Sequence, residues 1–278
     1  MFLYALAGAC YSPQVSPGAP CSADGSCPEG LDCISGLCLL PGTVVGTDDA
    51  GTLVDGPLPS PDGAVDAPMV AMPDAFVDTS LIAHWKMDDD PNNGALDSSG
   101  NGHTAACEGT CPTVVAAKVG SGYRFNGGQA LIAADSLDFR GNFTIAGWAL
   151  ADQVGPQMAI MSKPVGTGSS NSWQLELRDT GKMSFTGGSA HYLDEAGTTS
   201  AAVWRHVAGT WDGTTKRLYI NGVMVASVAS AITYDTHDIY LGADQNSGST
   251  VLEWDGVLDD LRIYNRVLSA SEIAALAE

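Results

Sequence analysis

Short apolar runs separated by turn-forming residues dominate the sequence from residue 81 to the C-terminus. In residues 81–87, apolar side chains alternate with His84 and Lys86, which is typical of a half-buried β-strand. Further on, Asn221-Gly222 lies between two apolar runs, and this dipeptide is a strong signal of a tight β-hairpin. Many short strands joined by turns predict an all-β fold of two antiparallel sheets, as in a sandwich or jelly roll.

The same pattern predicts further strands, followed by one helix. The strands are expected at residues 122–126, 130–133, 143–150, 157–162, 172–178, 182–185, 204–211, 239–242 and 257–264. Near the C-terminus, Ser269-Ala-Ser-Glu272 fits a capping box, and Ile273 and Leu276 then share one helical face. About 200 residues are enough to bury roughly 70% of the surface of the unfolded chain in one large core.

The amino-terminal part of the chain differs in composition. Residues 1–80 contain ten acidic residues and no Lys or Arg, and the formal net charge of the whole chain is −20. We predict a signal-peptide remnant at 1–10, a Cys-rich disulfide module at 11–40, an acidic, Pro-rich, disordered linker at 41–79 and the β-domain at 80–278. Strong negative charge repels nucleic acid and anionic lipid, so neither is expected as a partner.

Six of the seven cysteines are expected to form disulfides, which implies an oxidising compartment. They are Cys21, Cys27, Cys33 and Cys38 in the module, and Cys107 with Cys111 in the β-domain. Zinc binding is the alternative for the first four, but they lack the C-x2-C spacing that zinc sites usually have. The spacing does not fix which of these four cysteines pair with each other.

Cys10 is the remaining cysteine. It follows the apolar run Phe2–Ala9, which resembles the end of a bacterial lipoprotein signal peptide. We predict that Cys10 is lipidated and that the protein is exported. It is then either held at the outer membrane or cell surface by this lipid alone or extracellular. The run is short, has no preceding basic residue and places Leu6 one position too far from the cysteine; a start codon assigned too late would explain the first two features. A free thiol or an intermolecular disulfide is the alternative.

Several motifs of the β-domain are similar to those of one family. They are Asp97–Gly102, Gly122–Phe125, Phe143–Trp148, Trp204–Gly213, Leu218–Gly222 and Leu258–Arg266. Through them, residues 81–278 resemble the LamG-like jelly-roll family of the concanavalin A-like lectin and glucanase fold. The resemblance implies a two-sheet antiparallel jelly roll with a short C-terminal helix, in a domain that binds rather than catalyses. It does not specify the ligand, because this fold hosts lectins, adhesion modules and glycosidases.

The resemblance also implies a structural calcium ion, since many members carry one between the first strand, the loop after it and the last strand. The residues expected to supply its oxygen ligands are Asp88, Asp97, Asn101, Asp259 and Asp260. In the alternative, Asp97 caps its own turn, and Asp259 or Asp260 pairs with Arg262 or Arg266. An EF-hand starting at Asp88 is excluded, because its sixth and twelfth positions are not Gly and Glu.

The sequence contains no recognisable catalytic motif. Hydrolases of this fold typically carry their carboxylates on one strand as Glu-x-Asp-x-x-Glu, and this pattern is absent. The nucleophile-elbow, zinc-protease and phosphate-loop motifs are absent as well. Glu176 is expected to point outward between Leu175 and Leu177, and His206 is expected to be a core or hydrogen-bonded histidine. We therefore predict that the protein is not an enzyme.

Carbohydrate binding requires aromatic rings next to polar groups. Trp148 and Trp211 are expected to pack in or against the core. The candidates in predicted loops and strand ends are Tyr192, Asp194, Tyr234, His237, Asp244, Gln245, Asn246 and Trp254. The sequence thus predicts a surface binding or adhesion protein whose partner is a carbohydrate or a glycosylated or other protein. A glycan-active enzyme of the same fold and a purely structural spacer are the alternatives.

Overall fold

The chain divides into two compact units, Met1–Val70 and Ala71–Glu278. The computed structural model describes Cys27 and residues 32–34, 37–39, 78–134, 141–166, 168–189 and 192–278. In the first unit, β1 (Asp32–Ile34) and β2 (Leu37–Leu39) form an antiparallel pair.

The disulfides predicted for the Cys-rich module are borne out where the structure describes them. Cys27 and Cys33 are both disulfide-bonded, so the zinc alternative does not apply to these two thiols. The predicted lipidation site Cys10, the cysteine Cys21 and almost all of the predicted linker lie outside the described residues.

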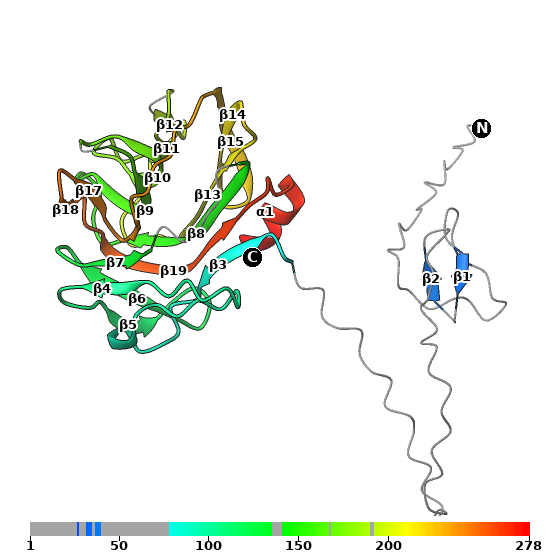
Figure 1. Ribbon diagram of the computed structural model, residues 1–278, viewed down its shortest axis with the longest axis horizontal. Coiled ribbons are helices and arrows are strands. Elements are labelled where there is room, and N and C mark those ends of the chain that lie inside the picture. Colours follow the sequence, from blue (N-terminus) through cyan, green and yellow to red (C-terminus); the bar gives the residue numbers. More distant parts are fainter. Residues whose placement is uncertain are drawn as a thin grey trace, which may run out of the picture. The chain divides into compact units, whose positions relative to one another are not determined.

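The second unit is a sandwich of two antiparallel sheets, as predicted, and the two layers are visible in Figure 1. The seven-stranded sheet has the order β12 (Tyr192–Asp194), β11 (Met183–Thr186), β10 (Asn171–Leu177), β9 (Met158–Pro164), β16 (Ile239–Leu241), β7 (Ala130–Ala133) and β4 (Ala106–Glu108). The eight-stranded sheet has the order β15 (Val223–Ala229), β14 (Thr215–Ile220), β13 (Arg205–Trp211), β8 (Phe143–Ala151), β19 (Asp255–Tyr264), β6 (Ser121–Asn126) and β5 (Thr113–Ala116), with β3 (Leu81–Trp85) paired to β19. A separate hairpin joins β17 (Asp244–Asn246) to β18 (Ser249–Val251).

The core lies between the two sheets because side chains alternate along each strand. In β10, Trp173, Leu175 and Leu177 face the core, and the ring of Trp173 meets that of Phe143 in β8 of the other sheet. Phe143 packs in turn on Trp211 of β13. Trp148 and Trp211 are both buried, as predicted. His206 is buried against the Trp148 ring, with ring centroids 5.3 Å apart, and burial lowers its pKa to about 4.

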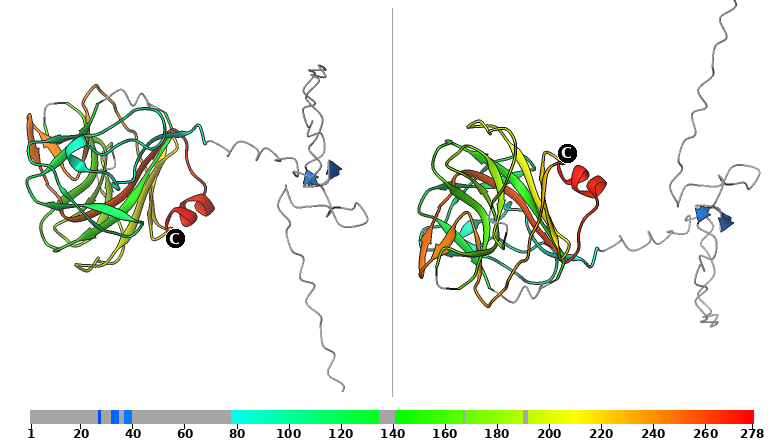
Figure 2. Two further views of the ribbon diagram at one scale, coloured as in Figure 1. Left: turned by 90° about the horizontal axis from the view of Figure 1, so that it is seen from below. Right: turned by 90° about the horizontal axis from the view of Figure 1, so that it is seen from above.

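The two local signals that were strongest in the sequence are confirmed. Asn221 and Gly222 both have positive φ, 48° and 79°, as the tight turn between β14 and β15 requires. Ser269 caps the helix α1 (Ala270–Leu276), and its capping box with Glu272 is complete. The helix lies outside the eight-stranded sheet beside β15, as Figures 1 and 2 show, and buries Ile273.

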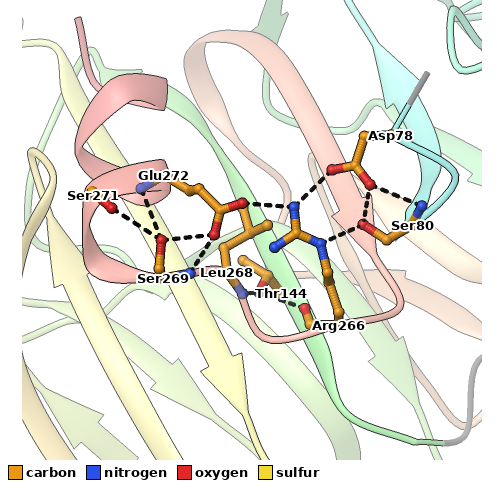
Figure 3. Close-up of polar contacts among 8 residues, drawn as sticks. All are labelled: Asp78, Ser80, Thr144, Arg266, Leu268, Ser269, Ser271 and Glu272. Carbon is orange, nitrogen blue, oxygen red and sulfur yellow. Dashed lines mark hydrogen bonds and ion pairs between the residues drawn. The ribbon is translucent and has the colours of Figure 1, made fainter. Parts of the chain in front are cut away.

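Arg266 joins the start of the domain to this helix (Figure 3). Its guanidinium donates to Asp78 Oδ2 at 2.8 Å, to Ser80 Oγ at 2.8 Å and to Glu272 Oε1 at 2.7 Å. The loop before the helix is fixed as well, because Thr144 Oγ1 accepts from the backbone N–H of Leu268. Both ends of the domain are therefore tied to the same arginine.

Cys107 and Cys111 form the predicted disulfide, with their Cα atoms 5.3 Å apart. Cys107 lies in β4, at the edge of the seven-stranded sheet, so the bond closes the chain just after this strand. Among the described residues, no helix has the length and apolar character needed to cross a membrane.

Candidate functional site

A polar cavity of about 420 Å³ lies where the β17–β18 hairpin meets strands β10, β11 and β12 of the seven-stranded sheet. In Figure 1 this hairpin stands beside β9 and β10. In β10, Trp173 and Leu175 point into the core, so Gln174 between them points the other way, into the cavity. The lining residues are Gln157, Ser169, Asn171, Gln174, Thr186, Tyr192, Asp244, Asn246, Val251 and Leu252.

Three buried side chains form a hydrogen-bonded group in the wall of this cavity. Asn171 Nδ2 donates to Gln174 Oε1 at 2.8 Å and to Asp244 Oδ2 at 3.0 Å, and each side chain belongs to a residue at most 7% exposed. These bonds leave Asn171 Oδ1, Gln174 Nε2 and Asp244 Oδ1 without a hydrogen-bond partner of normal geometry in the described part of the chain. A buried, unpaired polar atom costs free energy, so such a group is suited to a ligand that completes its hydrogen bonds.

Glu176 lies next to this group and is completely buried. Its carboxylate accepts hydrogen bonds from Gln157 Nε2, at 2.6 Å, and from the Thr186 hydroxyl. Burial raises the pKa of Glu176, and Asp244 raises it further through its negative charge. Glu176 alternates with Leu175 and Leu177 and points away from the core, as predicted, but side chains around the cavity cover it completely.

Tyr192 supplies an aromatic ring at the edge of the cavity. It is 46% exposed, and the guanidinium of Arg178 stacks 3.7 Å from the ring centre. Arg178 is itself fixed by Asp194, whose Oδ2 accepts from Nη1 at 3.1 Å. The ring is therefore held from one side by a cation–π contact while much of its surface stays accessible.

The structure brings together part of the predicted ligand-binding set. Tyr192, Asp244 and Asn246 line the cavity. Asp194 contributes indirectly by holding Arg178, and Gln245 is the neighbour of Asp244 in β17 but does not line the cavity.

The other three predicted ligand residues lie away from this cavity. Trp254 is fully buried in the hydrophobic core, so it offers no ring surface to a ligand, which corrects its assignment. Tyr234 packs against the core, with its ring 6.3 Å from that of Trp211, and burial raises its pKa. His237 pairs with Asp235, with Nδ1 2.8 Å from Oδ1.

Two of the predicted calcium ligands, Asp97 and Asn101, are engaged by hydrogen bonds within their turn and with strand β3. Asp97 Oδ1 accepts from the backbone N–H groups of His84 and Ser99, and Oδ2 accepts from the N–H of His103. Although burial acts in the opposite direction, these bonds lower the pKa of Asp97. Asn101 Nδ2 donates to two backbone carbonyls of β3. This is the turn-capping arrangement that the sequence allowed as the alternative for Asp97.

The other three predicted ligands separate into two places. Asp260 has a φ of 55°, and its Oδ1 lies 2.5 Å from His84 Nε2. Its Oδ2 lies 2.8 Å from Arg262 Nη2, which is the ion pair that the sequence allowed as the alternative to calcium. Asp259 is completely buried, and its Oδ2 accepts from the N–H of Val119 at 2.8 Å. Burial and the nearby Asp260 and Asp88 raise the pKa of Asp259 to about 7. Asp259 Oδ1 has no hydrogen-bond partner within the described residues.

These contacts do not assemble the five predicted calcium ligands into one site. Across residues 78–134, 141–166, 168–189, 192–278 and the described part of the first unit, no group of three or more His, Cys, Asp or Glu side chains is arranged to hold a metal ion. Asp88 and Asp259 remain as two neighbouring carboxylates, both facing the loop before β6.

A family model described as the concanavalin A-like lectin/glucanases superfamily matches residues 125–274, more than half of the chain. The chain belongs to this superfamily. The match covers every strand from β7 to β19 and most of α1, and thus all of the residues that line the cavity. No curated protein matches the chain.

Several solved structures share the fold. Domain 4 of AbnA, an extracellular arabinanase from Geobacillus stearothermophilus solved with arabinotriose, is 23% identical with a TM-score of 0.57, over 72% of this chain and 98% of that one. The binding domain of Paraclostridial Mosquitocidal Protein 1 is 20% identical with a TM-score of 0.56, over 72% and 52%. A mutant sialidase from Trypanosoma rangeli is 16% identical with a TM-score of 0.55, over 70% and 32%.

The described chain therefore spans nearly all of the arabinanase domain, about half of the toxin fragment and about a third of the sialidase. At these identities the likeness concerns the fold.

Sequence reasoning missed the cavity residues on the sheet itself. Gln157, Asn171, Gln174 and Thr186 lie in or beside predicted strands, where a polar residue usually marks a solvated face. One signal was present: β10 alternates apolar residues with Ser172, Gln174 and Glu176, and two of these three lack a charge. A strand whose outer face carries hydroxyl and amide groups instead of Lys and Arg is compatible with partial burial.

Proposed function

We propose that this concanavalin A-like domain binds carbohydrate in the polar cavity. The observation that carries the proposal is the group of unpaired polar atoms on Asn171, Gln174 and Asp244, next to the exposed ring of Tyr192. A sugar presents hydroxyl groups that both donate and accept hydrogen bonds, and apolar C–H faces that pack on aromatic rings. A saccharide therefore matches both features of this cavity, whose volume of about 420 Å³ lies in the range of small-ligand sites.

One of the solved structures that share the fold supports the same class of ligand. The arabinanase domain, with which this chain aligns over almost that domain's full length, was solved with arabinotriose. Support from a relative at 23% identity extends to the ligand class and not to the particular sugar.

The carboxyl groups of the cavity favour carbohydrate binding over hydrolysis. A glycosidase needs two carboxyl groups that both reach the scissile bond. Asp244 lines the cavity, but Glu176 is completely buried and both of its oxygens accept hydrogen bonds from neighbouring side chains. Analysis of oligosaccharides after long incubation with the protein tests this point, because cleavage products that disappear in Asp244→Asn would establish the enzyme alternative.

The proposal is tested by titrating the protein with neutral oligosaccharides, chosen first on a glycan array. We expect Tyr192→Ala to weaken binding by about tenfold, which corresponds to about 1.4 kcal/mol, because the stacking surface is lost. Tyr192→Phe should retain most of the affinity, since it keeps the ring. Val223→Ala, at a 66% exposed position on β15, is the matched surface control. Unchanged binding in Tyr192→Ala, or no binding of any glycan by the folded protein, would contradict the proposal.

A structural calcium ion remains part of the proposal, at the pair Asp88 and Asp259 instead of the five residues first expected. The supporting observation is Asp259 Oδ1, which is buried and unpaired among the described residues beside a second carboxylate. Backbone carbonyls or water would have to supply the remaining oxygen ligands. Thermal unfolding with calcium and then with EDTA tests this site, and a melting temperature that is the same in both would remove it.

Export and anchoring through a lipid on Cys10 also remain proposals. They are supported by the disulfides at Cys27, Cys33 and Cys107–Cys111, because such bonds persist in oxidising compartments. The mass of the amino-terminal peptide from membrane fractions, compared with that of Cys10→Ser, would reveal or exclude the acyl chains.

A further inference from the structure

Among the described residues that line the cavity, no basic side chain compensates its negative charge. Asp244 is 2% exposed and lines the cavity, and the fully buried Glu176 is close enough that its pKa is raised by Asp244. None of the described lining residues is Lys, Arg or His. Arg178, which acts electrostatically on Glu176, is already paired with Asp194 and stacked on Tyr192.

The hydrogen bonds of Asp244 leave one carboxylate oxygen available. Oδ2 accepts from Asn171 Nδ2 at 3.0 Å. Burial raises the pKa of Asp244, and the hydroxyl of Ser162 and the N–H of Gln245, which face the carboxylate, partly offset this rise. Oδ1 has no partner of normal geometry in the described chain, and the neighbouring Asn171 Oδ1 is in the same state. Two buried acceptors, one of them ionisable, thus lie together with one unpaired donor, Gln174 Nε2.

A buried carboxylate is stabilised most by a positively charged hydrogen-bond donor. A neutral hydroxyl supplies one donor and no charge, whereas an ammonium group supplies three donors and a full charge. Carboxylate- or sulfate-bearing sugars would instead add a negative charge next to Asp244 and Glu176.

We infer that the cavity selects saccharides bearing a free amino group, such as glucosamine units, with the ammonium placed between Asp244 Oδ1 and Asn171 Oδ1. This inference rests on the proposed carbohydrate function and specifies its substrate class. In the complex, the ammonium donates to both unpaired acceptors, and Gln174 Nε2 donates to a neighbouring sugar hydroxyl.

The test compares three β-1,4-linked trisaccharides that share one backbone and differ only at C2: glucose, glucosamine and N-acetylglucosamine. Each is titrated into the full chain by calorimetry near neutral pH, at low salt and with EDTA present, so that no metal ion supplies the charge. We expect the glucosamine trimer to bind at least about tenfold more tightly than the glucose trimer. We expect this gain in affinity to decrease when the salt is raised to about 0.3 M, because dissolved ions screen charges. The decrease should be smaller than for a charge pair on the protein surface, since buried pairs are screened less.

Asp244→Asn keeps the shape of the side chain and removes its charge. It should abolish the gain, so that this variant binds the glucosamine trimer no more tightly than the glucose trimer, with unchanged circular dichroism. Asp179→Asn is the matched control, because its side chain is 65% exposed and lies in the turn after β10. Asp179→Asn removes one negative charge from the surface, and it should still bind the glucosamine trimer more tightly than the glucose trimer.

The outcomes separate the two levels of the proposal. If the glucose or N-acetylglucosamine trimer binds as tightly as the glucosamine trimer, the amine inference fails while the carbohydrate function stands. If the gain persists in Asp244→Asn or is lost equally in Asp179→Asn, it arises from the overall negative charge and the inference also fails. If the folded protein binds none of the three trimers or any other glycan, the proposed function fails, and this inference with it.

Discussion

Lys216 shows how one buried side chain links the two sheets. It belongs to β14, is fully buried, and donates through Nζ to the carbonyl oxygens of Phe185 and Gly187, at 3.2 and 2.7 Å, at the end of β11. Burial lowers its pKa to about 8. Between this value and the ordinary value near 10.5, the unfolded chain binds more protons than the folded one, so the free energy of unfolding rises with pH in this range.

This linkage predicts a measurable pH dependence. From pH 8 to about 9.5, Lys216 should contribute a rise on the order of 1 kcal/mol in the free energy of unfolding. The increase should be absent in Lys216→Met and present in Lys86→Met, since Lys86 is exposed. Denaturant unfolding at several pH values measures it. The same slope in all three proteins would show that Lys216 is protonated equally in both states.

At the scale of elements, α1 depends on its amino-terminal cap. Ser269 accepts from the N–H of Glu272, and Glu272 accepts from the N–H of Ser269, so two backbone donors at the helix start are satisfied. The helix buries only Ile273 and has seven residues, which is too short to be stable without these contacts.

Loss of the cap should therefore cost more than the loss of an adjacent hydroxyl. We expect Ser269→Ala to lower the free energy of unfolding by about 1 kcal/mol and to speed hydrogen exchange in residues 270–276. Ser271→Ala is the matched control, because its hydroxyl contacts Ser269 but caps no backbone group (Figure 3), and it should change little. Equal effects of the two substitutions would argue against the capping role.

Local signals explain which elements the sequence predicted well. The hairpin at Asn221-Gly222 and the helix at Ser269 depend on residues within four positions of each other. Both elements can therefore be predicted from the local sequence, without the rest of the fold. The strands β17 and β18 were missed because Asp244-Gln-Asn and Ser249-Thr-Val are short and mostly polar, and their pairing depends on packing against β9.

At the scale of the whole molecule, the candidate site was harder to predict than the fold. The apolar alternation of many strands specifies two sheets and a core, but the cavity arises where Asn171 and Asp244, 73 positions apart, meet across different elements. The predicted calcium cluster shows the same limit. Asp97 and Asp260 had several available partners, and nearby N–H groups, His84 and Arg262 engage them in the folded domain.

The limits of the domain follow from Arg266, which holds both of its ends. Because Arg266 contacts Asp78 and Ser80 as well as Glu272, the folded domain should begin at or before residue 78, two residues earlier than the sequence suggested.

Fragments that start at Ala71 and at Asp78 should melt at the same temperature. A fragment that starts at Leu81 should melt a few degrees lower, since partly exposed ion pairs and hydrogen bonds contribute only about 1 kcal/mol in a domain of this size. Calorimetric melting of the three fragments measures this difference, and Asp78→Asn in the fragment starting at Asp78 should account for part of it. Identical melting of all three fragments would show that the contacts of Arg266 with residues 78–80 add nothing to stability, and the domain would then begin at β3.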